Sequence, residues 1–155
     1  MRILDANFNR SREGLRVCEE IARFVLEDRA LTARLKKARH EVSDSIKKFP
    51  VSVSELLASR NVRADVGKKT SRLEKRRRSA SALFLANAER AKESLRVLEE
   101  TSKLVDSNIS ERFKKVRFRV YAIEKKALPK LEALRHHGSR GDGQAEPERR
   151  GGPGD

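Results

Sequence analysis

The stretch ANFNRSREGLRVCEE (Ala6–Glu20) returns eighty residues later as ANAERAKESLRVLEE (Ala86–Glu100). Over the nineteen positions that start at these two alanines, nine residues are identical. Further on, RLKKARHEV at 34–42 resembles RFKKVRFRV at 112–120. Because both pieces recur in the same order, we infer that a helix hairpin has been duplicated. The sequence predicts an all-α four-helix bundle of two hairpins with pseudo-twofold symmetry and a basic loop between the halves.

The helix boundaries follow from apolar periodicity, capping residues and proline positions. We expect one helical domain over residues 1–134 and a disordered tail over 135–155. Within the domain, the predicted parts are repeat one (about 4–50), a linker (51–71) and repeat two (about 72–134). The predicted helices cover residues 5–26, 29–49, 52–58 and 72–105, with a Ser52–Glu55 capping box on the short helix. A last helix should follow the Ser/Asn/Ser break at 107–110 and run to about Leu134, with a bend near Pro129.

The chain carries a formal net charge of +14 in 155 residues. Residues 135–155 are neutral overall, and about half of the excess lies in Arg60–Arg78, which holds nine basic and two acidic residues. Such a charge concentration favours an anionic partner, either nucleic acid or small phosphorylated molecules. The single cysteine excludes an intramolecular disulfide, and no membrane span or signal peptide is evident, so we expect a cytoplasmic protein.

Several polar residues fall within the apolar arcs of the predicted helices. At about 100° per residue, Asn7 lies on the apolar stripe of the first helix, Arg10 lies inside its flank, and Glu13 lies at the edge. The repeat places Asn87, Arg90 and Glu93 in the same way, while Arg39 and Arg117 fall inside the stripes of the other two long helices. We therefore predict that these arginines face the interior. Glu19 is predicted on the solvent side, and Cys18 is interpreted as a packed core thiol.

Two interpretations of the inward polar residues stay open. Arg10 with Glu13 and Arg90 with Glu93 could be ion pairs that fix the helix register. Alternatively, the surplus of inward arginines could hold a buried phosphate, because a guanidinium fork matches two phosphate oxygens at once. The sequence has no glycine-rich phosphate loop, so any phosphate must be held by side chains and helix ends.

The basic loop holds a second candidate, in the stretch ASRNVRADVGKK at 58–69. Asp65 and the turn glycine Gly67 are surrounded by basic residues, among them Arg60. One interpretation is a solvated turn followed by a basic face. The other is a phosphate lid in which Asp65 serves as metal ligand or base.

These stretches together resemble a known bacterial module. RILDANFNRSREGLRVCEEIARFVLED, LTARLKKARHEV, SRNVRADVG and ANAERAKESLRVLEE, over roughly residues 2–130, are similar to the all-helical, monofunctional hydroxymethylpyrimidine-phosphate kinase family of thiamin biosynthesis. This module occurs alone or fused N-terminal to thiamine-phosphate synthase. The resemblance implies phosphoryl transfer from ATP to 4-amino-5-hydroxymethyl-2-methylpyrimidine phosphate, giving the diphosphate, with ATP as co-substrate.

The resemblance also implies site residues, although not their individual roles: Asn7, Arg10, Glu13, Arg16, Arg60, Asp65, Gly67, Asn87, Arg90, Glu93 and Arg96. Joining two phosphates gathers negative charge, so such a site needs fixed cations and Mg²⁺. Our hypothesis is that Arg10 and Arg90 clamp the two phosphates together with Arg39 and Arg117. Asp65 or Glu93 would hold Mg²⁺.

Other functions fit parts of the same sequence. The chain could be a non-catalytic partner that channels the pyrimidine to thiamine-phosphate synthase. Synthase activity itself is not expected, because a (β/α)₈ barrel typically needs about 250 residues. The third interpretation is a basic helical nucleic-acid binder, which the lack of aromatic residues among the basic ones disfavours. Homo-oligomerisation is left open.

Overall fold

The part of the chain that the structure describes contains five helices. The computed structural model describes residues 1–60, 77 and 79–138. They form α1 (Arg2–Phe24), α2 (Arg29–Ile46), α3 (Val53–Ala58), α4 (Ala80–Ser102) and α5 (Ser107–Gly138). The described residues include no strand, which confirms the all-α prediction. Most of the predicted linker and nearly all of the predicted tail fall outside these residues, but α5 extends four residues past the predicted domain end at Leu134.

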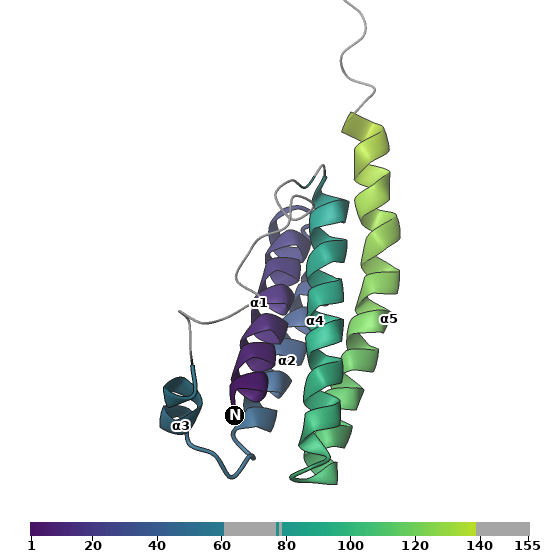
Figure 1. Cartoon of the computed structure of the whole chain (residues 1–155). Helices are drawn as coiled ribbons and strands as arrows, with labels where there is room; N and C mark the ends of the chain where they lie inside the picture. Colours follow the sequence, from purple (N-terminus) through teal and green to yellow (C-terminus); the bar gives the residue numbers. More distant parts are fainter. Residues whose placement is uncertain (61–76, 78, 139–155) are drawn as a thin grey trace, which may run out of the picture.

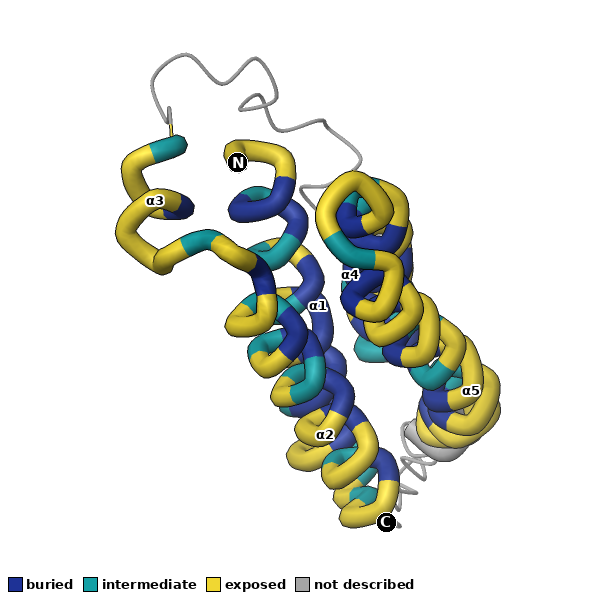
Figure 2. Tube along the Cα trace, turned by 90° about the horizontal axis from the view of Figure 1, so that it is seen from below, coloured by how far each residue is buried: buried dark blue, intermediate teal, exposed yellow. Residues whose placement is uncertain are grey.

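The four long helices pack side by side as a bundle (Figure 1). α1 packs against both α2 and α4, and α5 closes the bundle by packing against α4 and α2. α1 and α4 are antiparallel neighbours, while α3 lies beside the start of α1 (Figures 1 and 2). Arg119 of α5 forms an ion pair with Glu41 of α2. These two residues hold equivalent positions in the two hairpins, so they mark the pseudo-twofold relation between them.

Capping side chains set the beginnings of three helices. Asp28 accepts a hydrogen bond from Leu31 N at the start of α2, and the predicted Ser52–Glu55 capping box is present on α3. Ser79 caps α4 by accepting a hydrogen bond from Ala82 N at 3.1 Å. The predicted start of this helix at Arg72 was therefore wrong, because Ser79 has an extended backbone and its hydroxyl caps the first turn that follows.

Three further boundary predictions need correction. α1 begins at Arg2 and not at residue 5, so Asp5 is a buried residue inside its first turns. The first helix was predicted to run to residue 26, but α1 ends at Phe24 and is followed by the exposed Val25. The last helix already begins at Ser107, inside the predicted break, and continues through Pro129 to Gly138.

The core is mostly aliphatic, and the buried residues lie on the faces that the long helices turn toward one another (Figure 2). The fully buried side chains Leu15, Leu95, Phe84 and Phe113 come from both hairpins and belong to one core. Cys18 lies among them, as predicted, and its thiol donates to the carbonyl oxygen of Phe84 at 3.5 Å. Burial raises the pKa of Cys18 to about 12, so the thiol stays protonated and packs as an apolar group.

α1 and α4 approach each other closely at Gly14. A Cβ atom at this position would lie 2.6 Å from the carbonyl oxygen of Asn87 and 3.3 Å from Cβ of Ala91. Only a residue without a side chain fits there, so Gly14 sets the spacing of these two helices. Among the described helices, none is both long enough and apolar enough to cross a membrane.

Candidate functional site

Five of the predicted site residues, drawn from both repeats, meet in a groove between α1 and α4. A cavity of about 540 Å³ is lined there by Asn7, Arg10, Glu13, Arg90, Glu93, Ser94 and Val97. The first five of these residues were predicted from the sequence. The structure thus brings the first-repeat and second-repeat candidates into one site, and we call it the α1/α4 groove.

The groove follows the repeat closely. Arg10 and Glu13 line the groove from α1, and their equivalents Arg90 and Glu93 line it from the antiparallel α4. Ser94 occupies the position equivalent to Gly14, and its hydroxyl donates to the carbonyl oxygen of Arg90 at 2.7 Å. Two arginines and two glutamates therefore line the same cavity from two helices.

Of the two predicted asparagines, Asn7 lines the groove and Asn87 does not. The amide of Asn7 donates to the carbonyl oxygen of Ile3 at 2.8 Å, and Asn87 donates to the carbonyl oxygen of Leu83 at the same distance. Asn7 is buried, as predicted, and Asn87 is half-buried. The Asn7 amide has a second N–H and a carbonyl oxygen with which to contact a ligand in the groove.

The arginines of the groove are more exposed than the sequence pattern predicted. Both Arg10 and Arg90 are exposed, so the prediction that they face the interior was wrong. They start on the flank of their helices, and their long side chains reach the solvent at the groove mouth. Within the described part of the chain, Arg10 and Glu13 form no ion pair with each other. The structure therefore does not contain the ion pair between Arg10 and Glu13 that was considered as a way to fix the helix register.

A buried network uses two of the other predicted arginines. Arg39 of α2 donates through Nε to Glu19 of α1 at 2.9 Å. In the second hairpin, Arg117 donates to Glu99 through Nε at 3.0 Å and through Nη2 at 2.8 Å. Both arginines lie largely inside the bundle, as predicted, but they are bound to carboxylates and do not line the α1/α4 groove.

The carboxylates of this network were missed by the sequence analysis. Glu19 was placed on the solvent side, yet Glu19 is 5% exposed and Glu99 is 4% exposed. The available signal was the Glu-Glu pair at 19–20, which returns in register at 99–100. Predicted site residues Arg16 and Arg96 bind these glutamates from outside, each bridging two of them. Arg16 and Arg96 are thus part of the network and not of the groove.

The remaining predicted residues lie at the start of the basic loop. Arg60 donates to both carboxylate oxygens of Asp5, at 2.6 and 2.8 Å, and so ties the end of α3 to α1. These hydrogen bonds raise the pKa of Arg60 above its usual value. Arg60 does not line the groove. Asp65 and Gly67 lie outside the described residues.

The carboxylates of the groove bear on the predicted magnesium site. Among the described residues, no group of three or more histidine, cysteine, aspartate or glutamate side chains could hold a metal ion. Glu13 and Glu93 are the carboxylates that line the α1/α4 groove. Two carboxylates can hold Mg²⁺ only together with water or phosphate oxygens, so the magnesium and ATP predictions stay predictions.

Comparison with known proteins identifies the family. The ThiD2 family model matches residues 2–126. The chain belongs to the ThiD2 family. It is 44% identical over 124 residues to a thiamine-phosphate synthase of Thermosynechococcus vestitus, a match that covers 79% of this chain and 34% of the relative. A thiamine-phosphate synthase of Rhodopirellula baltica is 37% identical over 135 residues, which covers 86% of this chain and 36% of that protein. No solved structure matches.

These relatives support a helical domain of thiamin biosynthesis and correct the predicted activity. The matched proteins are named thiamine-phosphate synthase and not pyrimidine-phosphate kinase. The kinase prediction was therefore wrong, and the alternative that connects the chain with the synthase agrees better with the relatives. The chain spans about a third of the length of the relatives that it matches, so the activity of the whole relative does not transfer directly.

Proposed function

We propose that this ThiD2 chain is a non-catalytic helical partner of thiamine-phosphate synthase, and that the α1/α4 groove holds a phosphorylated aminopyrimidine for the synthase. The observation that carries the proposal is that two arginines, Arg10 of α1 and Arg90 of α4, line one groove. The relatives support the pathway, because the matched region belongs to proteins named for making thiamine phosphate.

The described fold supports a binding partner of the synthase, because it lacks the strands from which the synthase barrel is built. Residues 1–60 and 79–138 contain helices and no strands. A (β/α)₈ barrel requires eight parallel strands and typically about 250 residues. In this proposal the helical chain contributes binding, and the synthase carries out the chemistry.

The groove chemistry suits the proposed ligand. Guanidinium groups bind phosphate oxygens in pairs, and two of them from opposite walls can hold one phosphate. Glu13 and Glu93 lie beside them and accept hydrogen bonds, so either can bind the exocyclic amine of an aminopyrimidine. The cavity of about 540 Å³ falls within the usual range for small-ligand sites. Exposure of the two arginines allows the ligand to enter and leave readily.

Isothermal titration with 4-amino-5-hydroxymethyl-2-methylpyrimidine phosphate tests the groove directly. We expect saturable binding, weaker binding of the unphosphorylated alcohol, and about a tenfold or greater loss of affinity for Arg10→Gln and for Arg90→Gln. Arg23→Gln is the matched control, since Arg23 is exposed on α1 and does not line the groove. Equal affinities for wild type and both groove variants would refute the proposed site.

The partner role needs a separate measurement. Sedimentation velocity of the chain mixed with a thiamine-phosphate synthase that lacks this helical domain should show a complex. A mixture that sediments as two separate species would contradict the partnership. ADP release from MgATP in the presence of the pyrimidine phosphate would contradict the non-catalytic role, because a partner that only binds turns nothing over.

A further inference from the structure

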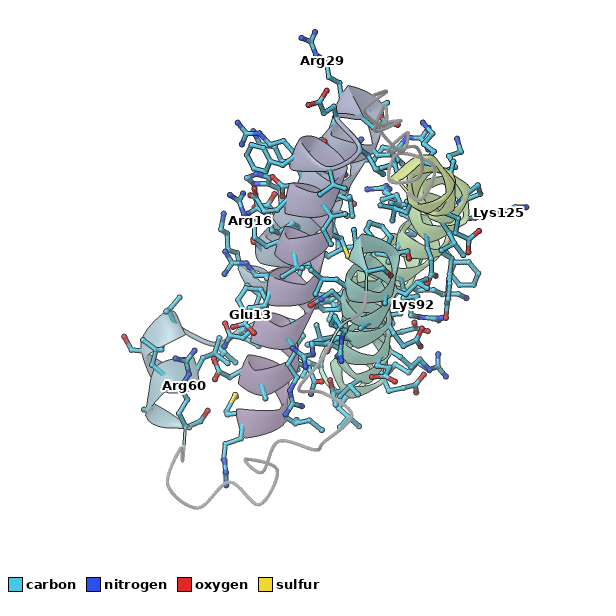
Figure 3. All side chains as sticks on the ribbon, turned by 90° about the horizontal axis from the view of Figure 1, so that it is seen from above. Glu13, Arg16, Arg29, Arg60, Lys92 and Lys125 are labelled. Carbon is cyan, nitrogen blue, oxygen red and sulfur yellow. The ribbon has the colours of Figure 1, made fainter. Side chains whose placement is uncertain are left out.

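A second cavity lies on the first hairpin, next to the α1/α4 groove. It has a volume of about 500 Å³ and is lined by Asn9, Arg12, Glu13, Arg16, Val17 and Arg39. Glu13 lines both cavities, but the arginines of the two are different. Figure 3 shows Glu13 and Arg16 along the same side of α1, with Lys92 across the molecule on α4. We call this second cavity the α1/α2 cavity.

The three arginines of the α1/α2 cavity differ in their hydrogen-bond and ion-pair partners. Arg16 and Arg39 both bind the buried carboxylate of Glu19. Arg12 is half-buried, and its Nε atom is buried without a hydrogen-bond partner among the described residues. Its guanidinium lies 5.2 Å from the centre of the Phe8 ring, which fixes the side chain but accepts no conventional hydrogen bond. A buried donor of this kind is uncommon and costs free energy unless a ligand or water satisfies it.

At the equivalent position of the second hairpin, the cationic side chain is paired with two carboxylates. Lys92 is the repeat equivalent of Arg12, and its Nζ binds Glu89 and Glu124, each at 2.7 Å. Lys92 also lies over a ring, 5.0 Å from the centre of Tyr121. The first hairpin has Asn9 in the position of Glu89 and Ile46 in the position of Glu124. Both carboxylates that neutralise the cation in the second hairpin are therefore missing in the first.

From this difference between the repeats we infer that the α1/α2 cavity is an anion-binding site for one carboxylate or phosphate group of a small molecule. The bound oxygens would take the place that the carboxylates of Glu89 and Glu124 take beside Lys92. Arg12 supplies a charge that no described carboxylate neutralises, and Arg16 and Arg39 add positive potential at the cavity wall. Val17 offers an apolar surface for the body of the ligand. The inference does not rest on the function proposed for the α1/α4 groove.

The test uses the full chain and the Nε–H signals of its arginines in ¹H–¹⁵N spectra. Sodium phosphate and sodium acetate are titrated separately at constant ionic strength, and the Arg12 signal is assigned with Arg12→Lys. We expect a saturable shift of the Arg12 signal with at least one anion, and the stronger response identifies the preferred group. Arg23 is the matched control, because it lies on the same helix and also stacks on a ring, 4.7 Å from the centre of Phe24.

A variant separates binding at this cavity from general charge. Asn9→Glu adds a carboxylate at the position of Glu89 while every arginine is kept, so it should weaken anion binding about tenfold or more. The Arg12 shift should persist in Arg10→Gln, which alters only the α1/α4 groove. The inference is wrong if Arg12 responds to both anions no more than Arg23 does, or if Asn9→Glu leaves the affinity unchanged.

Discussion

The buried ion pair of the second hairpin leads to a quantitative prediction. Glu99 is 4% exposed and accepts two hydrogen bonds from Arg117, at 3.0 and 2.8 Å. Glu99→Gln keeps the shape of the side chain but removes the charge, which leaves Arg117 largely buried without its counter-ion. Removing one partner of a buried pair costs roughly 3–5 kcal/mol. Because the Arg117 side chain is still 12% exposed, water compensates in part, and we expect about 3 kcal/mol.

Urea unfolding followed by far-ultraviolet circular dichroism measures this loss. With a urea dependence of about 1–3 kcal/mol per molar, the midpoint should fall by roughly 1–3 M. Glu93→Gln is the matched control on the same helix, since Glu93 is exposed and lines the groove. It should change the unfolding free energy by less than about 0.5 kcal/mol. The double variant Glu99→Leu/Arg117→Met should regain most of the loss, because an apolar pair needs no counter-ion. A Glu99→Gln protein as stable as Glu93→Gln would refute the reasoning.

Two further predictions concern the helix interface and the core thiol. Gly14→Ala should lower the unfolding free energy by about 1–3 kcal/mol, because the added Cβ meets the Asn87 carbonyl oxygen. Ser94→Ala, at the equivalent position of the second repeat, is the control and should lower it by no more than about 1 kcal/mol. Equal losses in the two variants would contradict the close approach of α1 and α4 at Gly14. Cys18, with its pKa raised to about 12 by burial, should react with a thiol reagent at pH 8 far more slowly in the folded chain than in urea. In the unfolded chain the thiol loses its proton near its ordinary pKa of 9.0, whereas in the folded chain it stays protonated there. The unfolding free energy should therefore fall as the pH rises above 9.0. Cys18→Ala should remove this contribution.

The duplicated sequence was enough to predict the all-α class and five of the seven residues that line the groove. The repeat paired Arg10 with Arg90 and Glu13 with Glu93, and the antiparallel packing of α1 and α4 brings these pairs into one cavity. Local chemistry also carried over: the Ser52–Glu55 capping box and the buried Cys18 were predicted from neighbouring residues alone. These features depend on short-range patterns that survive in any packing of the helices.

The burial of individual charges could not be predicted in the same way. A helical wheel assumes a single apolar face, but α1 packs against both α2 and α4, so its buried arc is wider than its apolar stripe. Glu19 lies on the part that faces α2 and needs Arg39 to be stable there. Conversely, Arg10 starts within the apolar arc but leaves it through its long side chain. The start of α4 was missed because lysine and arginine are good helix formers and give no boundary signal before Ser79.

The faithful repetition of polar residues thus has two causes that the structure separates. Glu19 and Glu99 recur because each hairpin must hold its own pair of helices together, and both copies have kept the same buried bonds. Arg10 and Arg90 recur at the place where the two hairpins meet, and there they line one cavity. Where the copies differ, at Arg12 and Lys92, one hairpin has kept internal carboxylates and the other has not. The difference between the repeats therefore points to a ligand at Arg12, which lacks the carboxylates that bind Lys92. The similarity between the repeats points to a ligand in the α1/α4 groove, where Arg10 and Arg90 line one cavity.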